Sequence, residues 1–410
     1  MVDLRTILSF LLAYLTIWPL WSFYVRSSTG SRAVLSKSDS KAESQGQVRQ
    51  CLKDTFYNGV RRDAKVYSQM GEDGIIESAF SCLKTTDKYY VEFGVEDGRE
   101  CTTRLLRERG GWSGLMMDGS HVNQSINLQK EFMTSSNIVS LFQKHGVPKQ
   151  YDFMTVDIDL NTFWVLQAIL AAGYRPRLLN VEINRNFPAT FKAYAVVNRP
   201  QAVWTQGCYF GASPLAYTRL AQFFGYRPLV FDQLAVNLFF VHTDSVGSMT
   251  PASSGNTSRV LQAAAAVSED LRKTSTRILH PTASSVDGSS SSRTTATSSS
   301  HAALAMISDI LLDPDFNLYA ADRALPSERQ GLRWPIHDGC SNKDWVHIPA
   351  HVNFSETLLD AGLAKIVLLE SVKGSPDDRG NTCDGVPCTI RVFRRAKYLG
   401  YQGMDDEDEK

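Results

Sequence analysis

The stretch that decides the fold is residues 88–118, KYYVEFGVEDGRECTTRLLRERGGWSGLMMD. It opens with the β-rich run 89–93, passes through a turn bounded by Gly94 and Gly98 and a helix-like segment, and ends in a second apolar run at Asp118. This order of elements is typical of the first half of a nucleotide-binding α/β sheet. Asp118 stands 20 residues beyond Gly98, about the offset at which a carboxylate meets ribose hydroxyls.

The acidic turn indicates which ligand the sheet would bind. Glu96 and Asp97 lie where a dinucleotide fingerprint brings the backbone close to a pyrophosphate, and two carboxylates there would repel phosphate. S-adenosyl-L-methionine carries a sulfonium and an α-ammonium and suffers no such repulsion, so we expect it rather than NAD. The alternative is an ordinary β-turn without a ligand.

Composition limits the classes of function. The chain has 410 residues, with 43 basic and 43 acidic side chains, so nothing in its charge predicts nucleic-acid binding or attraction to a membrane surface. Its length suits one sizeable α/β domain plus a smaller unit or a long insertion. Seven scattered cysteines indicate neither a disulfide scaffold nor a repeated metal module.

An uncharged run at residues 7–25, ILSFLLAYLTIWPLWSFYV, predicts a single transmembrane helix near the N-terminus, with a cleaved signal peptide as the alternative. Basic residues after the run favour a cytoplasmic location for the bulk of the chain. Sequons at Asn123, Asn256 and Asn353 and a Ser/Thr-rich stretch favour the lumen. We expect a single-pass protein of the ER or Golgi with a lumenal catalytic region.

Alternating patterns predict a seven-stranded, mostly parallel sheet. The expected strands are 89–93, the run ending at 118, 131–134, 151–159, 177–183, 228–232 and 236–242, and the expected helices include 68–83, 137–145, 164–172 and 214–224. The last two strands are joined by so short a link that one of them must run antiparallel. In such a sheet, ligands bind beyond the carboxyl ends of the parallel strands. Polar residues stand at four of these ends, namely Glu92 and Gly94, Asp118, Asp157 and Asp159, and Glu182 and Asn184.

The pattern divides the chain into five parts. We expect a short tail and membrane anchor over 1–26, a polar stalk over 27–50, the α/β domain over 51–242, a Ser/Thr-rich disordered linker over 243–300, and an extension with an acidic tail over 301–410. Within the extension, 364–369 and 389–393 are typical of strands. Cys383 and Cys388 between them would form a small disulfide or remain free thiols.

An ordered set of short motifs resembles the FkbM-like S-adenosylmethionine-dependent methyltransferases over roughly residues 65–242. The motifs are Ser68-Gln69, Glu72-Asp73-Gly74, Val91-Glu92-Phe93-Gly94, Gly111-Trp112-Ser113-Gly114, Met117-Asp118-Gly119, Val156-Asp157-Ile158-Asp159, and Val236-Asn237 followed by Phe239-Phe240-Val241. The resemblance implies a Rossmann-like class I methyltransferase fold and O-methylation of sugars or other hydroxylated metabolites.

The resemblance also assigns roles by motif position. It implies that Glu92 and Gly94, in the turn closed by Gly98, flank the methionine end of the cofactor, that Asp118 holds its ribose, and that Asp157 closes the pocket. Three positions depart from the family pattern. Leu160 stands where relatives have glycine, Thr162 where they have an acid, and Thr102 where they commonly have asparagine, and these changes put catalysis in doubt.

Methyl transfer to an alcohol needs alignment of the reacting atoms and a group that accepts the hydroxyl proton. Asp159 is the first candidate for this base or for orienting the acceptor, with Glu182 and His121 as alternates. The plain alternative for Asp159 is the N-cap of the helix that follows. The acceptor would be a small molecule or a glycan.

Two other functions fit parts of the sequence. Asp157-Ile158-Asp159 is similar to the metal-binding D-x-D sequence of a Golgi-type glycosyltransferase. Leu160 and Thr162 are also compatible with a non-catalytic, membrane-anchored scaffold that keeps the methyltransferase fold. His337-x2-Cys340 and His347-x3-His351 would suggest zinc, but Pro349 breaks the helical spacing, so we predict no metal site.

Overall fold

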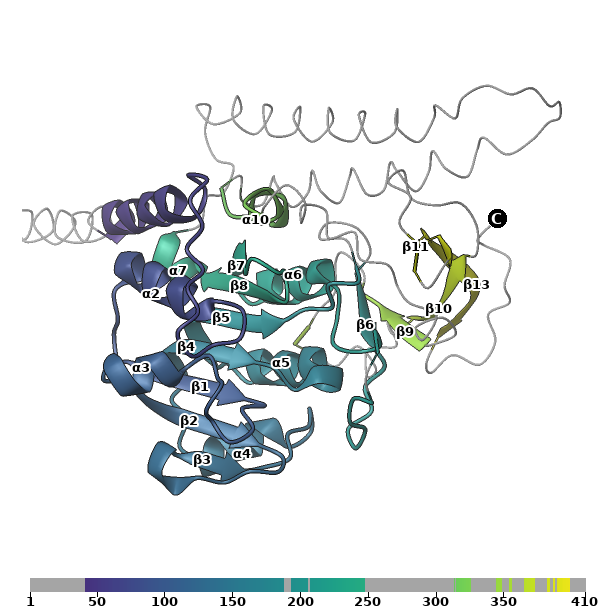
Figure 1. Cartoon of the computed structure of the whole chain (residues 1–410), viewed down its shortest axis with the longest axis horizontal. Helices are drawn as coiled ribbons and strands as arrows, with labels where there is room; N and C mark the ends of the chain where they lie inside the picture. Colours follow the sequence, from purple (N-terminus) through teal and green to yellow (C-terminus); the bar gives the residue numbers. More distant parts are fainter. Residues whose placement is uncertain are drawn as a thin grey trace, which may run out of the picture.

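The computed structural model describes residues 41–187, 193–205, 207–247, 313, 315–325, 344–348 and 354–355, and the backbone of 365–372, 382–383, 386–387 and 389–398 (Figure 1). The predicted anchor at 7–25 and nearly all of the predicted linker lie outside these residues. Among the described residues, no helix combines the length and the apolar character needed to span a bilayer.

The elements follow one another in an α/β order. Besides a helix at 41–56, the helices are α2 (Glu72–Leu83), α3 (Arg104–Arg109), η1 (Gln124–Ile126), α4 (Ile138–Lys144), η2 (Asp159–Asn161), α5 (Thr162–Ala171), α6 (Pro214–Phe223), α7 (Thr243–Val246) and α10 (Leu318–Arg323). The strands are β1 (Tyr89–Phe93), β2 (Ser113–Asp118), β3 (Leu128–Lys130), β4 (Gln150–Val156), β5 (Arg175–Glu182), β6 (Tyr194–Val196), β7 (Tyr226–Phe231), β8 (Asn237–His242), β9 (Asp344–His347), β10 (Lys365–Val372), β11 (Thr382–Cys383), β12 (Val386–Pro387) and β13 (Thr389–Tyr398).

The main sheet has seven strands in the order β3-β2-β1-β4-β5-β8-β7, which is consistent with a Rossmann-like fold. All neighbours pair in parallel except β8, which runs antiparallel to both β5 and β7. The sequence prediction of seven strands, mostly parallel with one reversed, is therefore confirmed.

The edge strand beside β2 differs from the prediction. It is β3 (Leu128–Lys130), whereas residues 131–134 were expected. Leu128 is fully buried and pairs with Met116, while the more β-prone Phe132 is 44% exposed. Burial against the sheet decided the position of this strand, and local β-propensity did not.

Alternate residues of the strands fill two apolar layers, one on each face of the sheet. Val91 and Phe93 contribute to the layer under α4, α5 and α6, whereas Tyr90 points into the layer beneath the 41–56 helix and α2. The strands are buried on both faces, as expected of a parallel sheet covered by helices (Figure 1).

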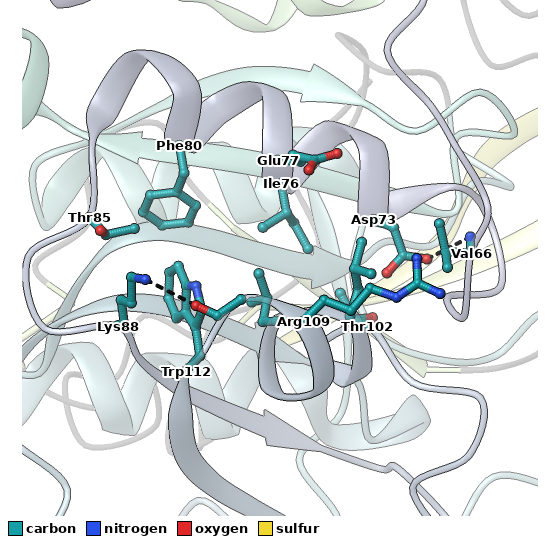
Figure 2. A pocket seen from close by; sticks show the side chains of 13 residues that line it. Val66, Asp73, Ile76, Glu77, Phe80, Thr85, Lys88, Thr102, Arg109 and Trp112 are labelled. Carbon is teal, nitrogen blue, oxygen red and sulfur yellow. Dashed lines mark hydrogen bonds between the residues drawn. The ribbon is translucent and has the colours of Figure 1, made fainter.

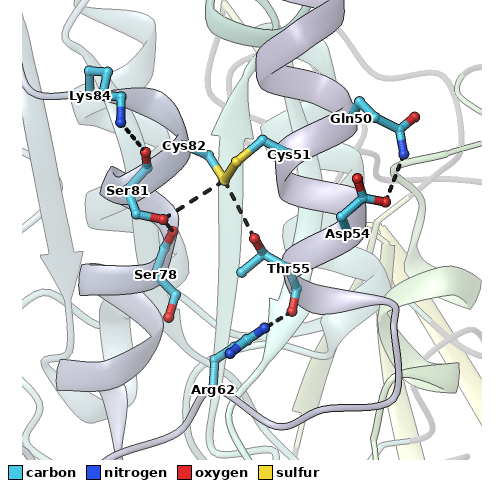
Figure 3. The surroundings of a disulfide bond; sticks show 9 residues. All are labelled: Gln50, Cys51, Asp54, Thr55, Arg62, Ser78, Ser81, Cys82 and Lys84. Atoms are coloured by element: carbon cyan, nitrogen blue, oxygen red, sulfur yellow. Dashed lines mark hydrogen bonds between the residues drawn. A yellow bond between two sulfur atoms is a disulfide. The ribbon is translucent and has the colours of Figure 1, made fainter.

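The folded part begins earlier than the sequence indicated. Residues 41–50, expected in the stalk, are helical and continue to 56. Arg49 in this helix is buried and forms ion pairs with Asp313 and Asp315. A disulfide between Cys51 and Cys82, which the spacing of the cysteines did not predict, ties the helix to α2 with a Cα–Cα distance of 5.6 Å (Figure 3).

The chain beyond 242 returns to the domain. A second sheet has the order β13-β10-β9-β6, so the C-terminal β9 pairs with β6, a strand absent from the sequence prediction. The expected strands at 364–369 and 389–393 correspond to β10 and β13. Leu318, Val346 and Phe354 belong to the same apolar layer as α5 and α6. The sequence predicted that the α/β domain ends at residue 242, but its apolar core also includes residues from the predicted extension. Cys383 lies in β11, and Cys388 lies outside the described residues.

Candidate functional site

The turn after β1 sits against the end of β4. Gly94 has a φ of +66°, and its N–H donates to the carbonyl of Met117 over 3.0 Å. A Cβ at Gly94 would lie 2.0 Å from the carbonyl oxygen of Asp157, so this approach requires glycine. The backbone of Gly94 is otherwise exposed, which leaves its outer side open to a ligand.

Asp118, at the end of β2, faces this turn. Its Oδ2 accepts the N–H of Glu96 over 2.9 Å, while its Oδ1 accepts four hydrogen bonds from Ser120 and His121. Burial raises the pKa of Asp118, but the hydrogen bonds from Ser120 and His121 outweigh it and hold the pKa below its usual value. Among the described residues, Oδ2 accepts only the N–H of Glu96, so this oxygen can accept a further hydrogen bond.

Glu92 and Gly98 have roles within the chain. Glu92 is buried, and its two oxygens accept the N–H groups of Thr102 and Thr103 over 2.7 and 3.0 Å, as well as the Thr103 hydroxyl. Burial raises its pKa. Gly98 has a φ of +76° and packs under η1, where a Cβ would lie 2.7 Å from Cδ1 of Ile126. Glu92 therefore holds the residues just before α3, and Gly98 lets the turn pack against η1.

Three carboxylates meet at the ends of β4 and β5. Oxygens of Asp157, Asp159 and Glu182 lie within 4.8 Å of one another, and we call these three residues the carboxylate trio. The sequence placed the two aspartates together by strand alternation, but β4 stops at Val156. They meet because Asp159 adopts a left-handed φ of +58° at the start of η2. The N-cap of α5 is Asn161, so Asp159 does not cap that helix.

The pKa of each carboxyl group in the trio is raised above its ordinary value. Burial, and secondarily the charge of Asp159, raises the pKa of Asp157 to about 6. Burial and the charge of Asp157 raise the pKa of Glu182 well above its usual value, and burial alone raises that of Asp159. The three residues are half-buried, so water screens their charges only in part, and protons or a cation would reduce the repulsion among them.

His121 does not join the trio. It is exposed at the end of β2, where its Nδ1 lies 3.2 Å from Oδ1 of Asp118. The trio stands at the ends of β4 and β5, and β1 lies between β2 and β4. With strands spaced about 4.8 Å apart, His121 is about 10 Å along the edge from Asp157. Of the three residues that the sequence suggested as the catalytic base, the fold brings Asp159 and Glu182 together and keeps His121 apart.

The acids before β1 form internal contacts. Oδ2 of Asp73 accepts the N–H groups of residues 66–68 and the hydroxyl of Ser68. Glu72 accepts the side-chain amide of Asn237 over 2.8 Å, and Asp232 accepts the backbone N–H of the same asparagine. The bond between Glu72 and Asn237 links α2 to β8, whereas the bonds of Asp73 hold the loop that precedes α2.

Sequence reasoning missed Tyr217. This residue of α6 is fully buried, and the charges of Glu182 and Asp157 raise the pKa of its hydroxyl further above the value that burial produces. Nothing in the sequence distinguishes it from the other apolar and aromatic residues on the buried face of an amphipathic helix.

A separate cavity of about 460 Å³ lies between α2 and α3 (Figure 2). Its walls include Phe80 and Trp112, with Arg109 and Glu77 at its polar border. Lys88, at the amino end of β1, also borders it and donates to the carbonyl of Gly110 over 3.0 Å. The cavity is therefore distinct from the carboxyl edge where the trio and Asp118 lie.

Comparison with protein-family models and with curated proteins returns no match to this chain. The features that bear on function are therefore the sheet and the side chains along its carboxyl edge.

Proposed function

We propose that the protein is an S-adenosyl-L-methionine-dependent methyltransferase that methylates a hydroxyl of a sugar or glycan-like acceptor. The observation that carries the proposal is the position of the Gly94–Gly98 turn, which meets Asp118 through the 2.9 Å hydrogen bond from Glu96. The strand order, with β8 reversed between β5 and β7, supports a class I methyltransferase fold, as the FkbM-like motifs imply.

The cofactor would lie along the edge from β2 to β4. The remaining acceptor position on Oδ2 of Asp118 suits a ribose hydroxyl, and the exposed backbone of Gly94 suits the methionine end. Asp157 borders Gly94 and would close the pocket on the side of β4. Negative charge from Glu96, Asp97 and the trio favours a cationic ligand over a pyrophosphate.

The trio would serve the acceptor. In the reaction, the methyl carbon forms a bond to the acceptor oxygen as its bond to sulfur breaks, so the sulfonium becomes a thioether and the hydroxyl loses its proton. Asp159 or Glu182 would take that proton, because a carboxylate whose pKa is raised is a stronger base. In-line alignment of the three atoms would provide most of the rate enhancement.

The anchor predicted at 7–25 supports a membrane location. The Cys51–Cys82 disulfide favours an oxidising compartment and therefore a lumenal catalytic region in the ER or Golgi. A hydroxyl-rich glycan acceptor suits such a compartment.

A metal-dependent glycosyltransferase is the second candidate. The close approach of Asp157, Asp159 and Glu182 favours it, because carboxylates can hold a divalent cation that bridges the phosphates of a nucleotide-sugar. This function would leave Asp118 and the Gly94–Gly98 turn without a role.

A non-catalytic scaffold is the third candidate. Leu160, where relatives have glycine, packs with Tyr194 and Trp345 of the second sheet. That packing gives the departure a structural role, which a binding module would preserve without any need for turnover.

Isothermal titration calorimetry of the full-length chain in a mild detergent tests these candidates side by side. We expect saturable binding of S-adenosylmethionine and S-adenosylhomocysteine and none of UDP-sugars. Asp118→Ala should weaken cofactor binding by about 10- to 100-fold, because it removes a hydrogen bond to a charged group. Glu100→Gln changes an exposed carboxylate nearby and should leave binding unchanged.

The opposite results separate the candidates. UDP-sugar binding that requires Mn²⁺, without adenosyl binding, would establish the glycosyltransferase. Cofactor binding without methylation of any hydroxylated acceptor would favour the scaffold, and the absence of all binding would overturn the proposal.

A further inference from the structure

We infer that the carboxylate trio binds a hard divalent cation, Mg²⁺ or Mn²⁺, with the hydroxyl of Tyr217 directed at the same site. This inference goes beyond methyl transfer and does not depend on it.

Two fully buried carboxylates elsewhere in this domain receive many hydrogen bonds, although Oδ1 of Asp73 accepts none among the described residues. Asp73 accepts four, and Asp152 accepts five, including one from a guanidinium. In the trio, the N–H of Asp159 donates to Oδ1 of Asp157 over a long 3.5 Å, and the side chains of Asp157 and Glu182 share a hydrogen bond, which requires that one of these two carboxyl groups hold a proton. Oε2 of Glu182 is buried and has no hydrogen-bond partner in the described part of the chain. Among the described residues, hydrogen-bond donors therefore compensate the trio less than they compensate Asp152, and a cation would replace the proton that Asp157 and Glu182 share.

A nearby arginine changes this balance only in part. Arg185 follows β5, and its charge lowers the pKa of Glu182, but this is the smallest of the influences on that carboxyl, and burial and the two aspartates dominate. Arg185 also has interactions of its own. One guanidinium shared in this way does not neutralise three carboxylates.

Tyr217 gives an independent indication from another element. It is 0% exposed, and its hydroxyl makes no hydrogen bond of acceptable geometry with any described residue, although Thr162 and the backbone of Ala212 are close. A Cβ at Gly211 would lie 3.2 Å from this hydroxyl and 3.7 and 3.9 Å from the carbonyl oxygens of Asp159 and Glu182. A buried hydroxyl without a hydrogen-bond partner, on which the charges of Glu182 and Asp157 act, is suited to a water or ligand oxygen held by a cation.

The ligand chemistry selects the class of cation. Three carboxylate oxygens without nitrogen or sulfur ligands suit Mg²⁺ and Mn²⁺, whereas Zn²⁺ sites mostly use histidine and cysteine. Three protein ligands leave positions for water or substrate oxygens in an octahedral sphere. Asp157 also borders the Gly94 turn, so the cation would lie where hydroxyls of an acceptor, or phosphates of a nucleotide-sugar, meet the cofactor turn.

The experiment is a Mn²⁺ titration of the full-length chain, with free Mn²⁺ read by electron paramagnetic resonance. We expect one saturable site per chain that Mg²⁺ displaces. Asp159→Asn and Glu182→Gln should each weaken binding at least about tenfold, because each removes a charged ligand. Glu77→Gln, an exposed change on α2, should have no effect.

Tyr217→Phe tests the site with little risk of misfolding, since it removes the hydroxyl and keeps the buried ring. We expect unchanged thermal unfolding without metal and Mn²⁺ binding weakened about 3- to 10-fold. No saturable Mn²⁺ binding by the unmodified chain, or unchanged affinity in both Asp159→Asn and Glu182→Gln, would overturn the inference. S-adenosylmethionine titration of the same proteins tests the proposed methyl transfer separately.

Discussion

Asp73 shows how a single carboxylate can organise a loop. Its Oδ2 accepts the N–H groups of Val66, Tyr67 and Ser68 over 2.7–2.9 Å, and Asp73 is almost fully buried. Helix α2 therefore begins at Glu72, four residues later than the apolar pattern predicted, because residues 66–68 give their N–H groups to this side chain. An acidic residue in the first turn of a helix here serves the preceding loop as well as the helix dipole.

We expect Asp73→Ala to lower the free energy of unfolding by about 2–4 kcal/mol, since it leaves buried N–H groups without an acceptor. Glu77→Ala, an exposed position one turn along the same helix, should change it by less than about 0.5 kcal/mol. Urea unfolding followed by circular dichroism measures both. Equal stability of the two variants would show that the loop finds other acceptors.

The pH dependence of stability should reflect Asp232. Burial, and secondarily the charge of Glu72, raises its pKa to about 7 from an ordinary value of 3.8. Between these two values the folded state holds a proton that the unfolded state has lost, so this group's contribution to stability falls as pH rises. The loss is at most about 1.4 kcal/mol per pH unit and is complete above pH 7.

Asp232→Asn should flatten the decline in stability between pH 5 and pH 7. The variant also places an amide opposite the N–H of Asn237, so its absolute stability falls, and the slope is the measurement that matters. Urea unfolding at pH 5, 6, 7 and 8 gives this slope for both proteins. A slope identical to that of the unmodified chain would mean that Asp232 is ionised throughout.

At the scale of elements, the disulfide joins two helices that sequence reasoning kept apart. Cys51 lies in the 41–56 helix and Cys82 in α2, 31 residues later (Figure 3). Val48 and Tyr57 also pack against the apolar layer that includes α2. The bond therefore reinforces a contact that burial already favours.

The double variant Cys51→Ser/Cys82→Ser should lose about 2–4 kcal/mol of unfolding free energy, because the unfolded chain gains freedom. Dithiothreitol should destabilise the unmodified chain more than the double variant. A non-reducing digest analysed by mass spectrometry should contain the linked peptides. Separate peptides and equal stability would contradict the bond.

The sequence predicted two strands of the second sheet, β10 and β13, but neither β6 nor β9 nor the pairing that joins them. Strand β6 has three residues, and it is stable because β9, about 150 residues later, pairs with it. Leu160, at the end of the motif that resembles those of FkbM-like methyltransferases, packs in the cluster that also holds Trp345 of β9, so it lies where the two sheets meet. A glycine at this position would remove those contacts.

At the scale of the molecule, glycosylation tests the orientation of the chain. Asn123 is exposed beside η1, and Ser125 completes its sequon. If the catalytic region is lumenal, the expressed chain should lose mass on endoglycosidase treatment, and Asn123→Gln should remove one glycan.

Two changes at Ser125 serve as a matched pair. Ser125→Ala should abolish the glycan at Asn123, and Ser125→Thr should retain it, because both hydroxyl residues support the sequon. A change in gel mobility after endoglycosidase treatment shows whether each variant carries the glycan. A chain without a glycan at Asn123 would place this face in the cytoplasm and oppose the lumenal proposal.

Local pattern determined most of the main sheet. Runs such as 89–93 and 236–242 are apolar, glycines mark the ends of several elements, and a short link between β7 and β8 requires one reversed strand. The acids at the strand ends were also visible, because parallel strands present their carboxyl ends at one edge. These properties depend on neighbours a few residues away, which a single sequence contains.

What only the tertiary structure decided depends on contacts between distant segments. Glu182 meets Asp157 because β5 pairs with β4, Tyr217 reaches them from α6, and His121 stays apart because β1 intervenes. The sequence also could not distinguish Glu92 from a ligand-binding carboxylate. In the structure, its carboxylate oxygens accept the backbone N–H groups of Thr102 and Thr103, just before α3. Residue type and spacing name the acids, but the partners that each side chain finds after folding decide which of them remain uncompensated.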